Sequence, residues 1–360
     1  EVLRRREIPK IQISDFVEGE RLRDYSLISG DSILFPYTPS LEVLREELDE
    51  PLFRWLWHFR TELWERREPN GNHRQIGKTW HEYSRFHPER YPGHGIGFAF
   101  VATHNHFVLD RGGKVFNRSA PVIKLPADAT EDDHLALLGL LNSSTACFWM
   151  KQVLSGKHKG DGGSAHADPA YQRFEFDGTK LQQIPIPVTR PLDNSRQLCE
   201  LAERLRVHAP SILLQNYVSF KHMSGNSIRN LFEVCKEQRT AIRNRMIALQ
   251  EELDWQCYRL YGLTDDDLTY SKEPPPIQFG ERAFEIVMQS RMATGELQTT
   301  WFERHNATPI AAPRSEWPED YQALVRRRME AIATNPNIAL IEQPEYKRRW
   351  AQEPWDDLEK

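Results

Sequence analysis

The spacing of apolar residues changes along this 360-residue chain, and this change constrains the fold more than any other feature. Between residues 95 and 125, short runs rich in β-branched and aromatic residues are broken by Arg111-Gly-Gly-Lys114, which predicts a meander of short strands with a tight glycine turn. Between residues 194 and 261, apolar residues recur at heptad-like spacing up to Gly262, which predicts long antiparallel helices. Strands followed by helices predict an α+β fold.

The same patterns divide the chain into four regions. Residues 1–92 are expected to form a linker with an aromatic and arginine-rich helical region, and residues 93–190 a β-rich core with a glycine-rich basic loop. Residues 191–273 are expected to be helical, and residues 274–360 to form a small mixed, mainly helical section. The last boundary falls at Pro274-Pro-Pro276, because consecutive prolines favour a stiff, extended segment.

Capping residues predict where individual helices begin. Thr130 is an expected N-cap because three acids follow it, and negative side chains are favourable in the first turn of a helix. Ser40 is an expected N-cap for a helix that carries three leucines, and Pro51 is expected to open a second helix that runs to Arg67. A last helix is expected near residues 319–332.

Tryptophan and arginine side chains share the segment that follows Pro51. Its tryptophans are Trp55, Trp57 and Trp64, and its arginines are Arg54, Arg60, Arg66 and Arg67. One interpretation is a helix whose tryptophan face packs against the protein while its arginine face is solvated. The other interpretation is an arm that faces phosphate groups. The first is the commoner outcome for such a helix, and the sequence leaves both open.

The total charge does not decide whether the chain binds nucleic acid. The formal net charge is -5, but residues 111–124 carry four basic residues and no acid, whereas residues 251–273 carry seven acids against two basic residues. Local sums matter more than the total for contact with phosphates. The four cysteines include no pair with the spacing of a zinc site, so we expect reduced, buried thiols.

Nothing in the sequence predicts a membrane segment. The longest apolar runs fall short of the roughly 18 residues that cross a bilayer, and no signal peptide is recognised at the start. We therefore expect a cytoplasmic protein that does not bind membranes. Because the chain begins with Glu1 and not with Met, we also expect it to be a segment of a longer protein.

A basic surface in the β-rich region is the candidate binding site. Lysine and arginine side chains hold a duplex in register through its phosphates, while polar and basic side chains on loops read base edges. The predicted DNA-binding residues are Arg111, Lys114, Arg118, Lys124, Lys157, His158, Lys159 and Arg173. For each of them, the alternative is an ordinary solvated surface residue.

No catalytic or metal-binding constellation emerges from the sequence. Gly93-His-Gly-Ile-Gly97 resembles a nucleotide-binding glycine loop, but β-like residues and not a helix follow it. Asp168-Pro-Ala-Tyr171 resembles a methyltransferase signature, but no apolar strand precedes it. His104-Asn-His106 spells the name of a nuclease family without the rest of its metal site, so we interpret the histidines as polar residues at a strand edge. Ser143 and Ser144 have no histidine and acid partners in the sequence.

Five segments of the sequence resemble one protein family. They are Phe100-Val-Ala-Thr-His-Asn-His-Phe-Val-Leu-Asp-Arg-Gly-Gly-Lys-Val-Phe-Asn-Arg-Ser-Ala-Pro-Val-Ile-Lys-Leu-Pro126, Leu137-Leu-Gly-Leu-Leu-Asn-Ser-Ser-Thr-Ala-Cys-Phe-Trp-Met-Lys-Gln152, Phe176-Asp-Gly-Thr-Lys-Leu-Gln-Gln-Ile-Pro185, Leu253-Asp-Trp-Gln-Cys-Tyr-Arg-Leu-Tyr-Gly-Leu263 and Asn337-Ile-Ala-Leu-Ile-Glu-Gln-Pro-Glu-Tyr-Lys-Arg-Arg-Trp350. These segments resemble the C-terminal part of the PglX-type adenine-specific DNA methyltransferases of bacteriophage-exclusion (BREX) systems.

The resemblance implies a division of labour within a longer enzyme. Its S-adenosylmethionine loop and Asn-Pro-Pro-Tyr motif would lie upstream, so the cofactor belongs to the parent protein and this segment alone is expected to hold no cofactor or catalytic residue. The parent would methylate the N6 atom of an adenine flipped out of duplex DNA. This segment would select the DNA target, with base specificity in variable loops, for which residues 155–171 are the best candidate.

The partners that the resemblance implies are double-stranded DNA, the upstream methyltransferase domain and other phage-exclusion proteins. The alternative function is a protein-interaction scaffold, in which the helices between residues 194 and 262, the acidic stretch 251–273 and the C-terminal section dock other components of the defence complex. An independent nuclease activity is the least favoured hypothesis.

Overall fold

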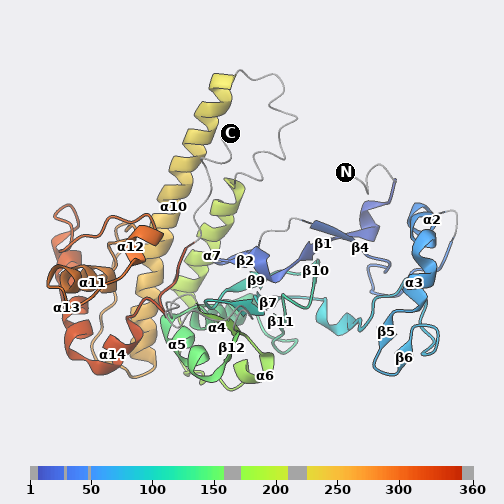
Figure 1. Ribbon diagram of the computed structural model, residues 1–360, viewed down its shortest axis with the longest axis horizontal. Helices are drawn as coiled ribbons and strands as arrows, with labels where there is room; N and C mark the ends of the chain where they lie inside the picture. Colours follow the sequence, from blue (N-terminus) through green and yellow to red (C-terminus); the bar gives the residue numbers. More distant parts are fainter. Residues whose placement is uncertain (1–6, 28–30, 48–49, 158–171, 210–224, 351–360) are drawn as a thin grey trace.

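The computed structural model describes residues 7–27, 31–47, 50–157, 172–209 and 225–350 (Figure 1). Helices account for more of these residues than strands, and the strands form several small sheets, which confirms the α+β class. In the described part of the chain, no helix is both long enough and apolar enough to cross a membrane. The four cysteines are buried and unpaired, as expected.

The first sheet joins the start of the chain to the β-rich region. Strand β1 (Ile13–Val17) pairs antiparallel with β4 (Asp31–Leu34) and parallel with β10 (Lys114–Phe116). The short strands β2 (Leu22–Arg23) and β3 (Ser26–Leu27) form a hairpin beside it. The first 92 residues, expected to be a linker and a helical region, therefore also contain strands.

Two further sheets form the β-rich region. The first has the order β11-β7-β9 and consists of β11 (Val122–Ile123), β7 (Gly95–Phe98) and β9 (Phe107–Asp110). The second has the order β12-β13-β8 and consists of β12 (Ser155–Lys157), β13 (Arg173–Glu175) and β8 (Val101–Ala102).

Short strands do form in this region, as predicted, but they do not form a meander. Gly112 and Gly113 both have positive φ values, of 100° and 79°, so the turn after β9 is as tight as expected. Strand β10, however, pairs with β1 and not with β9. The glycine turn therefore directs the chain from one sheet into another.

Helix α4 (Glu131–Leu141) packs against this region, and it begins where the sequence predicts. The Thr130 hydroxyl accepts the backbone N–H of Asp133, while the Asp133 carboxylate accepts the N–H of Thr130, which forms a capping box. The helix ends at Asn142, and Ser143 caps a second helix, α5 (Ser144–Val153).

Helices α7 (Leu192–Val207) and α10 (Gly225–Leu260) form the predicted antiparallel pair, which projects from the rest of the molecule (Figure 1). Asn194 near the start of α7 donates to Gln256 near the end of α10, whereas Arg239 donates to the carbonyl of Leu205. Gly262 follows α10 with a φ of 68°, as expected of a helix stop.

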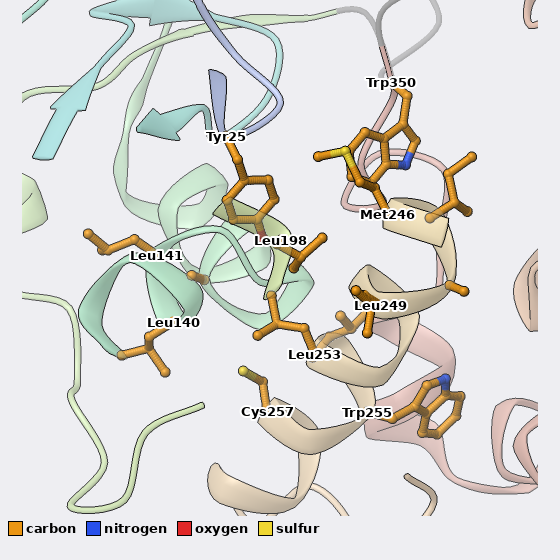
Figure 2. Packing of buried hydrophobic residues seen from close by; sticks show 14 of the residues in the cluster. Tyr25, Leu140, Leu141, Leu198, Met246, Leu249, Leu253, Trp255, Cys257 and Trp350 are labelled. Carbon is orange, nitrogen blue, oxygen red and sulfur yellow. The ribbon is translucent and has the colours of Figure 1, made fainter. Parts of the chain in front are cut away.

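A continuous hydrophobic cluster joins the β-rich region to the helices. Leucines of α4, α7 and α10 meet in it together with Tyr25 and Trp350 (Figure 2). The C-terminal helices α11 (Ala283–Ala293), α12 (Trp301–Arg304), α13 (Glu319–Thr334) and α14 (Pro336–Ile341) contribute to the same cluster. The helix expected near residues 319–332 is thus confirmed as α13.

The tryptophan- and arginine-rich segment lies at the end of the molecule opposite to α11–α14 (Figure 1). It comprises α2 (Pro51–Leu56), a single 3-10 turn, α3 (Arg60–Trp64) and a hairpin of β5 (Arg67–Glu68) and β6 (Gly71–Asn72). Pro51 does open a helix, but the helical turns end at Trp64 and Arg67 lies in β5, so the predicted extent to Arg67 is wrong. The prediction from Ser40 is wrong as well. Thr38 there hydrogen-bonds Ser40 and the N–H of Glu42, and these local bonds favour a turn over a helix.

Candidate nucleic-acid interface

The pair of strands β12 and β13 forms the base of the glycine-rich loop. Their antiparallel register places Lys157 opposite Arg173, at the end of the ladder where residues 158–171 connect the two strands. The predicted site residues His158 and Lys159 belong to that connection and lie outside the described residues, as does Asp168-Pro-Ala-Tyr171. Two predicted basic residues therefore flank the base of the loop.

Buried aromatic residues anchor the strand that carries Arg173. Phe174 and Phe176 are buried in the main hydrophobic cluster, and the N–H of Phe176 donates to the carbonyl of Phe100 at 2.7 Å. Phe174 also pairs with Ala102 of β8. Because successive residues of a strand point to opposite faces, the packing of Phe174 leaves Arg173 and Glu175 on the outer face.

The charges on this face are accessible to solvent. Lys157 Nζ lies 2.8 Å from Glu175 Oε2, and both side chains are partly exposed, so the ion pair is weak and can exchange for another anion. Arg173 is exposed and has no ion pair with another residue of the described chain. The guanidinium of Arg173 is thus available to an external ligand.

Arg118 belongs to a segment that is joined to the end of β13 through backbone hydrogen bonds of Phe100. Arg118 is exposed in a turn that Asn117 stabilises, since Asn117 Oδ1 accepts both the N–H and the hydroxyl of Ser119. The carbonyl of Ser119 accepts the N–H of Phe100 at 2.9 Å, and the carbonyl of Phe100 accepts the N–H of Phe176. The segments that carry Arg118 and Arg173 are therefore both hydrogen-bonded to one residue.

Lys114 and Lys124 make contacts within the protein, whereas Arg111 forms a surface ion pair as exposed as that of Lys157. Arg111 pairs with Glu131 at 2.7 Å, and this hydrogen bond raises the pKa of the guanidinium. Lys114 pairs with Asp110 at 2.7 Å. The Nζ of Lys124 donates to the carbonyl oxygens of three consecutive residues, 92–94, and burial lowers the pKa of this lysine. Lys114 and Lys124 are therefore engaged internally, while Arg111, Arg118, Lys157 and Arg173 keep exposed side chains.

The His104-Asn-His106 segment is buried, so its interpretation as a strand edge is wrong. The Asn105 side chain donates to the carbonyls of Leu141 and Ser143, at 2.7 and 3.0 Å. Burial lowers the pKa of both histidines well below the ordinary value. Across the described residues, no group of three or more His, Cys, Asp or Glu side chains could hold a metal ion.

A buried polar network that the sequence did not predict lies beside these histidines. Arg348 donates to the Asn142 side chain at 2.7 Å, to the carbonyl of Asn105 at 3.0 Å and to Gln250 at 3.1 Å. It also donates to the Nδ1 atom of His106, which keeps that nitrogen unprotonated. Arg348 therefore links the C-terminal segment to the β-rich region and to α10.

Lys347 forms the second half of this network. Its Nζ lies 2.9 Å from a carboxylate oxygen of each of Glu251, Asp254 and Glu342. Asp254 also accepts the hydroxyl of Ser144 at 2.6 Å, so Ser144 does have an acid partner in space, and both side chains are buried. Several acids of the stretch 251–273 are thus used internally and are not free to dock another protein.

The remaining glycine-rich motif does not form a nucleotide loop. Gly95 and Gly97 are residues of β7, which pairs with β9 and β11 and does not lead into a helix. A side chain at Gly95 would overlap Val122, at 2.8 Å from the Cβ position, so the glycine permits close strand packing. Its role is therefore structural.

Two comparisons with known proteins show what this chain is similar to. Residues 246–360 match a family described as a domain of unknown function (DUF7008). The chain is 43% identical over 355 residues to the adenine-specific methyltransferase PglX of Streptomyces coelicolor, an alignment that covers 95% of this chain and 29% of the relative. The chain thus spans under a third of the length of that protein. The resemblance seen in the sequence is confirmed, since nearly the whole chain is similar to a segment of a PglX-type adenine-specific methyltransferase.

Proposed function

We propose that this segment recognises the duplex-DNA target of an S-adenosylmethionine-dependent adenine-N6 methyltransferase that acts in phage defence. The observation that carries the proposal is the 43% identity, over 95% of the chain, to a protein named an adenine-specific methyltransferase. The methyl donor and the pocket for the flipped adenine would belong to a catalytic domain outside the segment, since residues 95–97 of the glycine-rich motif lie in β7 and do not form a cofactor loop.

Arg118, Lys157 and Arg173 are suited to bind phosphate groups and so to position the protein on a duplex. Phosphate contacts fix the register of a protein on a duplex, while base-edge contacts carry the sequence information. Arg173 sits on a strand anchored by buried aromatics, so its backbone does not need to be ordered on binding. Residues 158–171, which join the two strands, would then reach the base edges.

Arginine suits this position for a chemical reason. A guanidinium presents a planar fork of N–H donors that matches two phosphate oxygens. Each phosphate that a cation neutralises releases counterions from the DNA, so log K falls with log salt by about 0.9 per contact. Loss of Arg118 and Arg173 should therefore weaken binding and reduce that slope by about 1.8.

Salt-dependent binding tests this proposal. Fluorescence anisotropy of a labelled duplex with mixed adenine sites would be measured over a salt series, with this segment and with the protein that also carries the methyltransferase domain. The variant Arg118→Ala/Arg173→Ala is compared with Arg326→Ala/Arg327→Ala, which removes the same charge from α13. Absence of salt-sensitive binding by both folded proteins, or equal slopes for the two variants, would refute the proposal.

One observation favours a second candidate, a protein-interaction scaffold. On the projecting pair of helices, the side chains of Val207 and Val234 are 57% and 47% exposed. These apolar side chains would fit a contact with the upstream methyltransferase domain. The variant Val207→Asp/Val234→Asp should then lower the affinity of this segment for a separately made methyltransferase domain. The salt slope of DNA binding should stay unchanged. An unchanged affinity for that domain would exclude this surface.

A further inference from the structure

The arm, which we define as residues 51–91, has a core of its own. Leu52, Phe53 and Trp80 are buried in it, and Phe53 meets Trp80 edge to face. The Arg66 guanidinium donates to the carbonyls of Leu63, Trp80 and Glu82, which ties α3 to the following loop. The outer surface of the arm is therefore held by a rigid frame.

The outer surface of the arm is partly aromatic: Trp57 is exposed, while Trp55 and Trp64 are half-buried, so the interpretation in which the tryptophan face packs inward holds only in part. Trp57 and Phe59 are 42% and 49% exposed, whereas leucine and phenylalanine fill the inner face. The Arg60 guanidinium lies 4.4 Å from the centre of the Trp57 ring, and the Arg74 guanidinium lies 5.2 Å from that of Trp64. Two guanidinium groups are thus stacked on indole rings at the surface.

Stacking prepares these arginines to bind an anion. A guanidinium that rests on an aromatic face keeps its N–H donors at the edge of the plane, where a phosphate can accept them. The contact also restricts the long side chain before binding, so less conformational entropy is lost when a ligand arrives. An unstacked surface arginine lacks this advantage.

The net charge of the arm favours a polyanion: residues 51–91 carry eight lysine and arginine side chains against five glutamates, including the exposed Glu62 of α3 and Glu65 directly after it. Arg54 and Arg67 are exposed, and neither has an ion pair with another described residue. Arg60 is held by only one distant ion pair, at 4.0 Å from Glu46. Glu68 is turned inward, where it binds Lys78 at 2.9 Å and therefore does not neutralise the outer surface.

The arm is attached to the same sheet that leads to the candidate interface. Phe35 and Tyr37 pack with Val115 of β10 in one buried cluster, and the Tyr37 ring stacks on Phe86 of the arm at 3.9 Å. Arg118 follows two residues after the end of β10. A duplex bound at Arg118 would therefore be held by a part of the protein that packs against the arm.

We infer that the arm is a second DNA-contacting surface, in which the stacked Arg60 and Arg74 bind the phosphate backbone beside the recognised sequence. The inference rests on the proposed function, because it adds a flanking contact to a duplex that the β-rich region selects. The paired guanidinium–indole stacks favour nucleic acid, since phosphates lie along its whole length whatever the base sequence.

Anisotropy titrations with the full chain test the arm separately from the candidate interface. Two labelled duplexes are used, one of about two helical turns and one twice as long. The variants are Arg60→Ala/Arg74→Ala, the charge-conserving Arg74→Lys, and the control Arg326→Ala/Arg327→Ala on α13. The control removes the same charge from two exposed arginines that are not stacked on an indole. Circular dichroism confirms that each variant is folded.

The contribution of the arm to DNA affinity should appear with the long duplex. Arg60→Ala/Arg74→Ala should reduce the salt slope by about 1.8 and weaken binding roughly 30-fold at about 0.15 M salt, while the control stays close to wild type. Arg74→Lys should give a smaller loss, since it keeps the charge and loses the planar stack. On the short duplex, the arm variant and wild type should bind alike.

The possible failures are distinguishable. If neither the wild-type segment nor the protein that also carries the methyltransferase domain binds duplex DNA, the proposed function fails. If Arg118→Ala/Arg173→Ala weakens binding and the arm variant does not, the inference is overturned and the proposed function stands. If the arm variant loses equal affinity for both duplexes, the arm does not contact DNA beside the recognised sequence. Competition by polyglutamate as strong as by duplex DNA would overturn nucleic acid as the partner, in favour of an acidic protein.

Discussion

Replacing Lys347 with methionine should destabilise the protein strongly at neutral pH. The ammonium group is 1% exposed and lies 2.9 Å from Glu251, Asp254 and Glu342. Methionine fills a similar volume but leaves those carboxylates without their cation. Removing one member of a buried ion cluster costs about 3 to 5 kcal/mol, because the remaining charges stay away from water. That loss is a large part of the roughly 5 to 15 kcal/mol by which proteins are stable.

Urea unfolding followed by circular dichroism measures this effect, with Lys272→Met as the matched control. Lys272 pairs with Asp320 at 2.5 Å on the surface, so its loss should change the midpoint little. The penalty for Lys347→Met should also shrink as the pH falls. Burial already raises the pKa of Glu342, and the folded state will take up a proton there more readily once the lysine is gone. A loss under about 1 kcal/mol, or a penalty independent of pH, would refute this reasoning.

Three further predictions concern stability. Burial holds the folded pKa values of His104 and His106 well below the ordinary value, so the stability is fully present above about pH 6.5 and falls as the pH drops from 7 to 5; urea midpoints that stay constant over this range would contradict it. Thr130→Ala should cost about 1 kcal/mol by removing the N-cap of α4, and an unchanged midpoint would show that the capping box is dispensable. Gly280→Ala should cost at least about 2 kcal/mol, because φ is 91° and the new Cβ would lie 2.4 Å from the Thr308 carbonyl; a thermal midpoint equal to wild type would count against it.

Local signals in the sequence predicted local structure well. Thr130 and Gly262 act through hydrogen bonds and backbone angles within a few residues, so the start of α4 and the end of α10 follow from the residues themselves. The pairing of β10 with β1 depends on contacts between residues about a hundred positions apart, such as Asp15 with Lys114. No periodicity in either segment specifies that partner.

The candidate site was predictable only in part. The sum of charges in residues 111–124 identified basic residues, but a sum does not show that Lys124 is held by three backbone carbonyls. Lys347 and Arg348 are a stronger example, because consecutive basic residues usually lie at the surface. Their partners on α10 are more than ninety residues earlier in the chain, so neither burial nor pairing follows from sequence spacing.

Arg348 also sets an order of events during protein synthesis. Its partner His106 leaves the ribosome 242 residues earlier. At about 5 to 20 residues per second, His106 is therefore made roughly 10 to 50 s before the arginine that binds it. During that interval, the Asn105 carbonyl and the Asn142 side chain lack the hydrogen bonds that Arg348 donates to them. The newly made β-rich region is therefore the stage at which this chain should depend most on chaperones.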